Sequence, residues 1–136
     1  MAEVMVLDAS ATVDLFLRLP GSDDVIEILR QARAFAAPAH LDADVASALA
    51  RLHRRGEISG EVADEAVEEL ASAPVVRVPL AGLVAAAWDL RRAVAMADAF
   101  YVALAARFAA PLVTTDPRLA AVCSAQALCP VAPPRR

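Results

Sequence analysis

The chain lacks lysine altogether, because all thirteen of its cationic residues are arginine. Mechanisms that require a catalytic lysine are therefore excluded. Cysteine is scarce as well: Cys123 and Cys129 lie six positions apart, form no CxxC motif and have no histidine nearby. That spacing indicates neither a zinc site nor a redox pair, and we expect reduced, partly buried thiols.

Long hydrophobic runs are also missing, although 59% of the 136 residues are hydrophobic and the mean hydropathy is +0.50. The longest apolar stretches are broken by Arg77, Pro79 or Asp98, and none reaches the roughly 18 residues that a membrane helix needs. The start, MAEVMVLDAS, carries an acid and no basic residue where a signal peptide would be positive. We therefore expect a cytoplasmic protein that engages no membrane.

The apolar content exceeds what one small core can hide, which predicts a surface that is buried against a partner. A homodimer or a second protein would provide this partner, and the homodimer is the assembly we expect. An unusually alanine-rich core is the alternative explanation.

The charge balance limits how nucleic acid could bind. The net charge is −4 and the pI about 5.1, so the field of the whole protein does not attract RNA, and any contact must be local. Candidates for phosphate contacts are Arg54, Arg55, Arg91, Arg92 and Arg107. The alternative is that these residues are solvated helix ends.

Segments typical of strands and of helices alternate along the chain. Short strands are predicted at 4–7, 34–37, 75–78 and 111–115, with a further edge strand at 127–131. Helices are predicted from Ser10 as N-cap to about Leu19, from Ser22, over 41–55, from Ser59, up to Arg92, over 97–109, and after Asp116-Pro117. This pattern predicts an α/β fold with a central parallel sheet of four to five short strands flanked by helices. We expect one domain over 1–136, with a loose C-terminal tail at 130–136.

Four aspartates interrupt stretches that are otherwise apolar. Asp8 directly follows the first predicted strand and Asp116 follows the fourth, which places both at carboxyl ends of parallel strands, where ligands bind. Asp44 falls within the apolar stripe of the 41–55 helix, and Asp98 lies in the first turn of a helix that is apolar nearly all round. Ionised carboxylates that face a core are costly unless they are paired or bound to metal, so these residues predict one shared acidic site.

Each acid also has a structural interpretation. Asp8 and Asp116 could be helix N-caps, and Asp98 could complement a helix dipole. If the four do gather, two charges at 4 Å repel by roughly 4 kcal/mol at an effective dielectric near 20. A cluster therefore needs raised pKa values or a bound cation, and carboxylate oxygens suit Mg²⁺, or Mn²⁺ in its place.

Three segments carry a resemblance to a known family: VMVLDASATVDLFL, PAHLDADVASAL and ADAFYVALAARFAAPLVTTDPRLA. Together they cover nearly the whole chain and resemble a PIN domain, most closely the VapC toxins of bacterial toxin–antitoxin pairs. The resemblance implies a PIN-like three-layer fold and an acidic pocket that binds Mg²⁺ or Mn²⁺. It further implies an endoribonuclease that cleaves RNA phosphodiesters with metal-activated water, and a cognate VapB-type antitoxin as partner.

The same resemblance assigns roles to individual residues. Asp8, Asp98 and Asp116 match acids that would hold the metal, and Ser10 and Thr115 fall where small hydroxyl residues support the pocket.

The remaining catalytic position usually carries glutamate and here is Asp44, one methylene shorter, which would assist a second ion or orient water. Its neighbour Asp42 points elsewhere on the helix and is a poor substitute. Asp14 and Asp89 are interpreted as surface residues, and His40 and His53 are not interpreted as metal ligands. The predicted catalytic residues are therefore Asp8, Asp44, Asp98 and Asp116.

Rival functions remain open. A phosphoacceptor domain also binds Mg²⁺ at strand ends, but the lysine that partners its aspartate is absent here. A haloacid-dehalogenase-type phosphatase would need Asp-x-Asp after the first strand, where this chain has Asp8-Ala9-Ser10. A third alternative is a non-catalytic PIN-like binding module, in which Asp44 has cost the activity.

Overall fold

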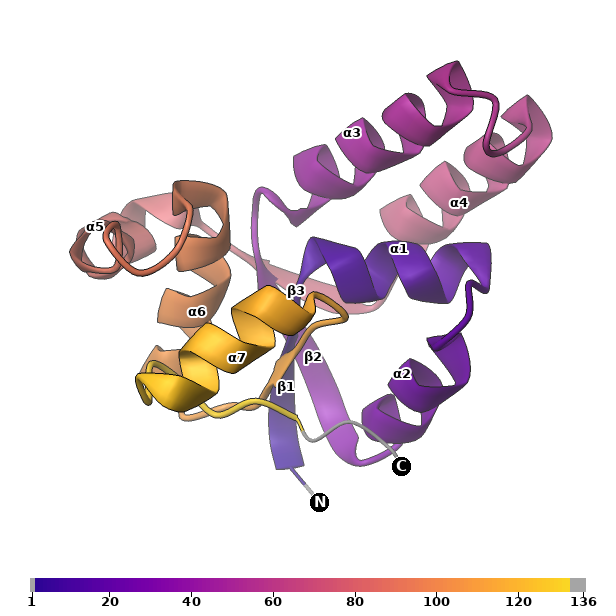
Figure 1. Cartoon of the computed structure of the whole chain (residues 1–136). Coiled ribbons are helices and arrows are strands. Elements are labelled where there is room, and N and C mark those ends of the chain that lie inside the picture. The colour runs from indigo at the N-terminus through magenta and orange to yellow at the C-terminus, as the bar shows by residue number, and fades with distance from the viewer. Residues whose placement is uncertain (1, 133–136) are drawn as a thin grey trace.

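Four parallel strands form one sheet in the computed structural model, which describes residues 2–132. They are β1 (Ala2–Leu7), β2 (Ala32–Pro38), β3 (Val75–Val78) and β4 (Leu112–Val113), in the order β3-β2-β1-β4. The α/β class and the central parallel sheet predicted from the sequence are confirmed (Figure 1).

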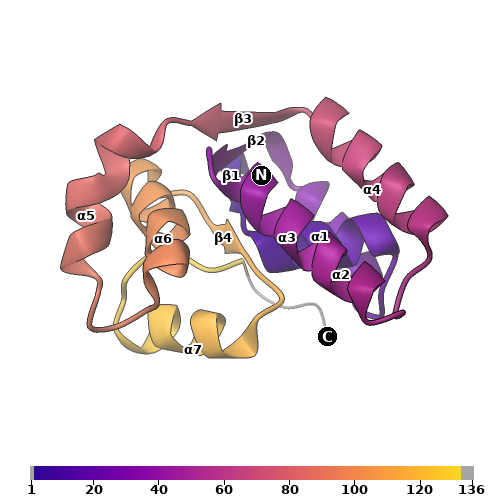
Figure 2. The same ribbon diagram turned by 90° about the horizontal axis from the view of Figure 1, so that it is seen from above.

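Helices cover both faces of this sheet. They are α1 (Ala9–Leu17), α2 (Ser22–Leu29), α3 (Leu41–Arg54), α4 (Gly60–Ser72), α5 (Val84–Asp89), α6 (Met96–Phe108) and α7 (Pro117–Ala125), with a 3-10 turn at Leu80–Leu83. Helices α1 to α4 lie on one side of the sheet and α5 to α7 on the other (Figure 2). The arrangement therefore has three layers.

The direction in which strands are added reverses at β1. The first two crossovers, through α1 and α2 and then through α3 and α4, place β2 and β3 to one side of it. The third, through α5 and α6, returns past β1 and places β4 on its other side, with Val6 paired to Leu112 and Leu7 to Val113. Ligands of open α/β sheets bind at the carboxyl ends of strands at such a switch.

The first turns of α3 and α6 lie close to this switch, and the burial of the apolar faces of both helices holds them there. In α3, Leu41, Val45 and Leu49 are buried at helical spacing. In α6, residue 99 and residues 101–105 are buried, so the helix is enclosed on nearly every side, as its composition predicted. One cluster of buried side chains joins both helices to the sheet.

The predicted cap of α1 is wrong, because Asp8 and not Ser10 caps this helix. The Asp8 side chain accepts a hydrogen bond from the N–H of Ala11, and the helix begins at Ala9. Asp8 has the extended backbone that an N-cap needs, whereas Ser10 already lies in the first turn. The chain therefore passes from β1 into α1 without a loop.

The strand β4 is shorter than the predicted stretch 111–115. It pairs with β1 only through Leu112 and Val113. The two threonines that follow leave the sheet, and Thr114 and Thr115 both form hydrogen bonds with Ser10 in α1. The end of β4 is thereby tied to the start of α1 and not to a strand.

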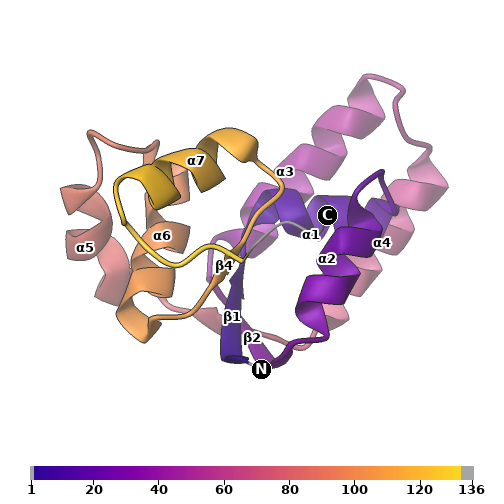
Figure 3. The same cartoon turned by 60° about the horizontal axis from the view of Figure 1, so that its bottom comes forward.

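The edge strand predicted at 127–131 is reduced to one parallel bridge between Leu112 and Val131. The N–H of Leu112 donates to the carbonyl of Pro130, and the N–H of Ala132 donates to the carbonyl of Leu112. Figure 3 shows this last described segment running back beside β4. The rest of the predicted tail, residues 133–136, lies outside the described residues.

Many of the buried residues are alanine, so part of the apolar content is explained by a core of small side chains. Large apolar side chains nevertheless remain exposed, among them Val76 at 64%, Trp88 at 55% and Phe108 at 55%. Within residues 2–132 no helix combines the length and the apolar character needed to cross a membrane.

Arg77 in β3 joins three elements through its guanidinium group. It donates to the carbonyls of Leu70 and Ala73 at the end of α4, at 2.6 and 2.9 Å, and to the carbonyl of Val75 at 2.9 Å. It also pairs with the Asp42 carboxylate of α3 at 2.9 Å. A cation that binds the last carbonyls of a helix satisfies groups that otherwise lack a partner.

We predict that Arg77→Ala lowers the free energy of unfolding by about 2 kcal/mol, because the carbonyls at the end of α4 lose a charged donor. The control is Arg33→Ala, whose ion pair with Glu3 spans 3.8 Å between two side chains that are 70% and 80% exposed. That exposed pair should contribute at most about 0.5 kcal/mol. Urea unfolding measures both, and equal unfolding midpoints for the two variants would contradict the prediction.

Candidate active site

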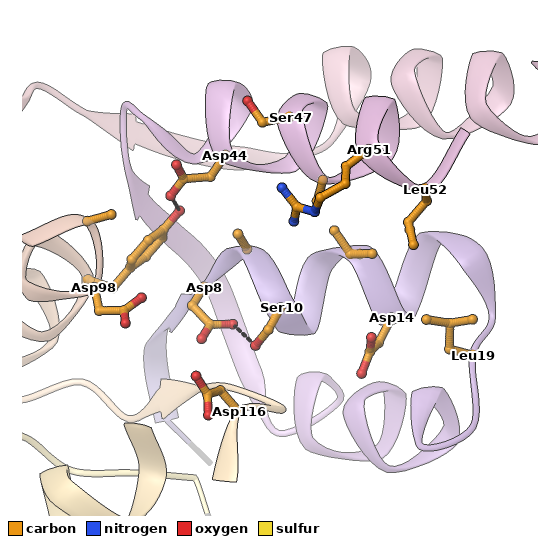
Figure 4. A pocket seen from close by; sticks show the side chains of 15 residues that line it. Asp8, Ser10, Asp14, Leu19, Asp44, Ser47, Arg51, Leu52, Asp98 and Asp116 are labelled. Carbon is orange, nitrogen blue, oxygen red and sulfur yellow. Dashed lines mark hydrogen bonds between the residues drawn. The ribbon is translucent and has the colours of Figure 1, made fainter. Parts of the chain in front are cut away.

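A pocket of about 550 Å³ opens at the switch in the sheet, where β1 and β4 end. Four aspartates line it, each from a different part of the fold: Asp8 after β1, Asp44 in the first turn of α3, Asp98 in the first turn of α6, and Asp116 before α7. In Figure 4 the carboxylates of Asp8, Asp98 and Asp116 face a common space, with Asp44 above them. The four acids identified from the sequence thus lie in one pocket.

Asp8 is the most deeply buried of these acids, at 4% exposure. The Ser10 hydroxyl and the Ala11 N–H donate to its Oδ1 at 2.7 and 2.9 Å. Burial raises the pKa of Asp8 to about 6 despite these hydrogen bonds, which lower it, and the charge of Asp98 adds to the rise. The folded protein therefore keeps a carboxyl here whose charge is costly.

Asp116 caps α7 as well as lining the pocket. Its Oδ1 accepts hydrogen bonds from the N–H groups of Arg118 and Leu119 at 2.9 and 3.4 Å. Its own N–H donates to the Thr114 hydroxyl at 3.0 Å, and that hydroxyl lies 3.2 Å from the Ser10 Oγ. A short chain of hydroxyl groups therefore connects the caps of α1 and α7.

The two predicted supporting residues contribute in different ways. Ser10 bonds to Asp8 and lines the pocket. Thr115 supplies its backbone N–H, which donates to the Ser10 Oγ at 3.0 Å, while the hydroxyl at this junction belongs to Thr114. Sequence reasoning missed Thr114, because which of the two adjacent threonine side chains points toward Ser10 depends on where β4 ends.

The pKa of Asp98 is affected by three neighbouring side chains as well as by burial. Burial raises its pKa, the charges of Asp116 and Asp44 raise it further, and His40 lowers it. Asp98 in turn raises the pKa of Asp8. The charges of the other acids therefore act on Asp98, and a cation bound near it would relieve this repulsion.

Asp44 is held by an aromatic residue of α6. The hydroxyl of Tyr101, a residue that is 1% exposed, donates to the Asp44 Oδ2 at 2.9 Å. The His40 Nε2 lies 3.4 Å from the same oxygen and donates to the Ala97 carbonyl at 2.9 Å. Burial and the Asp44 charge raise the pKa of Tyr101, so the hydroxyl remains a donor. The orientation of this shorter acid is therefore fixed from outside its own helix.

Sequence reasoning missed several residues around the acids. Tyr101 lies three positions after Asp98 on a buried helix, a spacing that places both at the same end of one face. Asp14, interpreted as a surface residue of α1, and Arg51 of α3 both line the same pocket. Arg51 follows Asp44 by seven positions and so shares its helix face, which is the signal that could have identified it.

The donor set of this pocket fits a divalent cation that keeps part of its water shell. Within residues 2–132, no three His, Cys, Asp or Glu side chains are arranged as a ready-made ligand set for one ion. Mg²⁺ usually retains several waters and takes only one or two carboxylates directly. Carboxylates that repel one another around a shared, partly buried space supply the charge that such an ion needs.

The chain belongs to the PIN domain family, which it matches over residues 5–125. Among its relatives is Ribonuclease VapC3 of Mycobacterium tuberculosis, 43% identical over 118 residues that cover 87% of this chain and 86% of that protein. Ribonuclease VapC12 of the same organism is 40% identical over 117 residues, covering 86% and 90%. Ribonuclease VapC9 is 33% identical over 128 residues, covering 94% and 96%. The resemblance inferred from the three sequence segments is thus confirmed.

We predict that Asp8 makes the metal-free protein less stable as the pH rises. Because the pKa of Asp8 is raised from 3.8 to about 6, the folded protein holds a proton there that the unfolded chain has already lost. The free energy of unfolding should therefore fall by about 3 kcal/mol between about pH 4 and pH 6 and stay low above. Asp8→Asn, which keeps the helix cap, should remove this part of the fall.

Urea unfolding in EDTA at pH 4, 5, 6 and 7 measures this difference. The control is Asp89→Asn, because Asp89 is exposed on α5, and its profile should follow that of the unmodified protein. An Asp8→Asn profile parallel to that of the unmodified protein would contradict the assignment.

Proposed function

We propose that this protein is a metal-dependent endoribonuclease and the toxin of a VapBC-type toxin–antitoxin pair. Its relatives are named ribonucleases, so cleavage of RNA is the activity to which the family points. The observation that carries the proposal is the gathering of four aspartates from separate elements in one pocket, with raised pKa values at Asp8 and Asp98. Charges this costly, held at a sheet switch, are typical of a catalytic site.

Asp8, Asp98 and Asp116 are the residues that would hold Mg²⁺, or Mn²⁺ in its place. When bound, such an ion lowers the pKa of water and neutralises charge that develops on the phosphodiester. In Asp8 and Asp116 the helix caps use Oδ1, so the second carboxylate oxygen lies outside the cap interaction. The caps fix the orientation of both side chains before any ligand arrives.

Asp44 has a separate role in this proposal. Its Oδ2 accepts the Tyr101 hydroxyl, which restricts the shorter side chain to one orientation in the pocket wall. A carboxylate so placed can accept a hydrogen bond from the attacking water, or assist a second ion. Tyr101 acts through Asp44 and is therefore a positioning residue.

The same proposal includes partners. A VapB-type antitoxin would bind the toxin and close the acidic pocket, with an arginine directed at the acids. Self-association as a homodimer would cover some of the exposed apolar side chains, such as Val76 and Phe108. With RNA as the substrate, we propose the cytoplasm as the site of action.

The test is cleavage of an RNA pool by the purified protein in Mg²⁺. We expect cleavage that EDTA abolishes and that falls roughly 100-fold or more in Asp8→Asn and in Asp98→Asn, because each removes a charge needed to bind the ion. Asp89→Asn, on the exposed part of α5, should retain full activity.

Cleavage that persists in EDTA, or in both site variants, would overturn the metal-nuclease proposal. A protein that binds RNA or an antitoxin but cleaves no RNA in Mg²⁺ or Mn²⁺ would instead support the non-catalytic PIN-like module.

Tyr101→Phe tests the role of the tyrosine, because it removes the hydroxyl bond to Asp44 and keeps the buried ring. We expect the Mg²⁺ concentration for half-maximal cleavage to rise roughly tenfold, as when a group that orients a metal ligand is lost. Asp42→Asn alters an acid of the same helix that pairs with Arg77 and should leave this concentration unchanged. Equal concentrations for the two variants would show that Tyr101 has no such role.

A further inference from the structure

The pocket continues between α1 and α3 beyond the four acids, and an arginine lies on its wall. Among residues 2–132, Arg51 is the one cation that lines the pocket, where five aspartates lie once Asp14 is counted. In Figure 4 the Arg51 side chain extends from α3 above α1, with its guanidinium turned toward the end of the pocket that holds Asp8 and Asp44. A ligand that enters the pocket would therefore meet this guanidinium.

The geometry of α3 relates Arg51 to the catalytic end. Arg51 follows Asp44 by seven residues and Ala48, between them, lines the same pocket, so the three share one face of the helix. Seven residues of α-helix span about 10 Å along the axis, and the long arginine side chain is directed back along that distance. A strand whose cleaved phosphate lies at the acids would thus pass Arg51 with a neighbouring phosphate.

Two of the arginines that the sequence offered as candidate phosphate contacts bind to other groups. Arg107 donates to the carbonyl of Gly82 at 2.7 Å. Arg91 donates to the carbonyl of Trp88 at 3.0 Å and lies over its ring at 4.6 Å. The exposed guanidinium of Arg51, by contrast, takes part in no hydrogen bond or ion pair with the rest of the described chain.

Charge explains why a cation is needed at this position. The chain has a net charge of −4, and the pocket gathers five of its carboxylates at the place where an RNA backbone must approach. A divalent ion at Asp8, Asp98 and Asp116 would offset repulsion only at its own phosphate. The flanking phosphates need a separate partner, and the planar guanidinium group binds phosphate oxygens through two parallel hydrogen bonds.

We propose that Arg51 binds a phosphate next to the one that is cleaved and so positions the RNA strand across the acids. The proposal rests on the nuclease function proposed above, and it concerns substrate binding rather than the chemical step. Arg51 is a positioning residue in this scheme. Because the contact is to the backbone, it favours no base sequence.

Binding of a fluorescein-labelled, single-stranded RNA of mixed sequence tests the proposal, measured by anisotropy in Mg²⁺. The full chain with Asp98→Asn is the background, so that the RNA survives. We expect Arg51→Ala to weaken binding about tenfold, and to reduce the slope of log affinity against log salt by about 0.7, the value for one phosphate contact on a single strand. Arg51→Lys should keep the slope, because the charge remains, and lose less affinity.

Arg33→Ala is the control, because Arg33 is an exposed arginine at the start of β2, at the end of the strands opposite to the pocket, which it does not line. Its affinity and salt slope should equal those of the background protein. If Arg51→Ala behaves like Arg33→Ala in both measurements, the proposal is overturned. A changed urea midpoint in Arg51→Ala with an unchanged salt slope would also overturn it, since that pattern indicates a structural role.

Cleavage kinetics with all four acids intact provide the second measurement. Arg51→Ala should raise KM about tenfold and leave kcat within about threefold, as expected for a contact made equally in the bound and transition states. A fall in kcat with unchanged KM would contradict a role in strand binding. Failure of the nuclease proposal is read separately, from cleavage by Asp8→Asn and Asp98→Asn, whereas the comparison of Arg51 with Arg33 depends on binding alone.

Discussion

The pairing of β4 with β1 is the constraint on which the rest of the pocket depends. It brings Val113 beside Leu7, so that the residues after each strand emerge at the same edge of the sheet. Asp8 follows β1 directly and Asp116 follows β4 after two threonines, and the hydroxyls of Ser10 and Thr114 connect them. Helix α6, which leads into β4, carries Asp98 into the same space. Without this strand pair, Asp8 and Asp116 would not meet at the same edge of the sheet.

Structural and functional interpretations of the acids turn out to be compatible. Asp8 and Asp116 are N-caps, as the structural interpretation proposed, and both also line the pocket. A helix N-terminus attracts negative charge, so each cap offsets part of the cost of keeping a carboxylate in a crowded acidic space. The effect is incomplete, since burial still raises the pKa of Asp8 to about 6. The N-termini of α1 and α7 therefore stabilise carboxylates that would be more costly in an apolar core without them.

Much of the fold could be predicted because the apolar patterns are strong. The buried face of α3, the enclosure of α6 and the strand at Val75–Val78 all follow from spacing and composition. That the four aspartates lie near one another could also be predicted, because the ends of strands and the turns of buried helices can be recognised from apolar patterns in the sequence.

What the sequence could not show depends on contacts between distant segments. The cap of α1 at Asp8 is a local contact that the sequence had left open beside Ser10, whereas the role of Thr114 follows from where β4 ends, which local patterns do not reveal. Tyr101 reaches Asp44 across 57 positions of sequence, and no periodicity within either helix encodes that bond. Arg51 had a local signal, its helix face, yet only the pocket shows what that face adjoins.

The bond between Thr115 and Ser10 joins residues 105 positions apart, and this span has a consequence for synthesis of the protein. The first acid is made early, but the pocket is complete only when β4 and the start of α7 have left the ribosome and docked beside β1. Contacts between residues so far apart form slowly, because the long loop between them must be closed first. A nascent chain that has not reached residue 98 therefore carries Asp8 and Asp44 without Asp98 and Asp116, and the messenger and ribosome that produce it meet no finished acidic pocket at that stage.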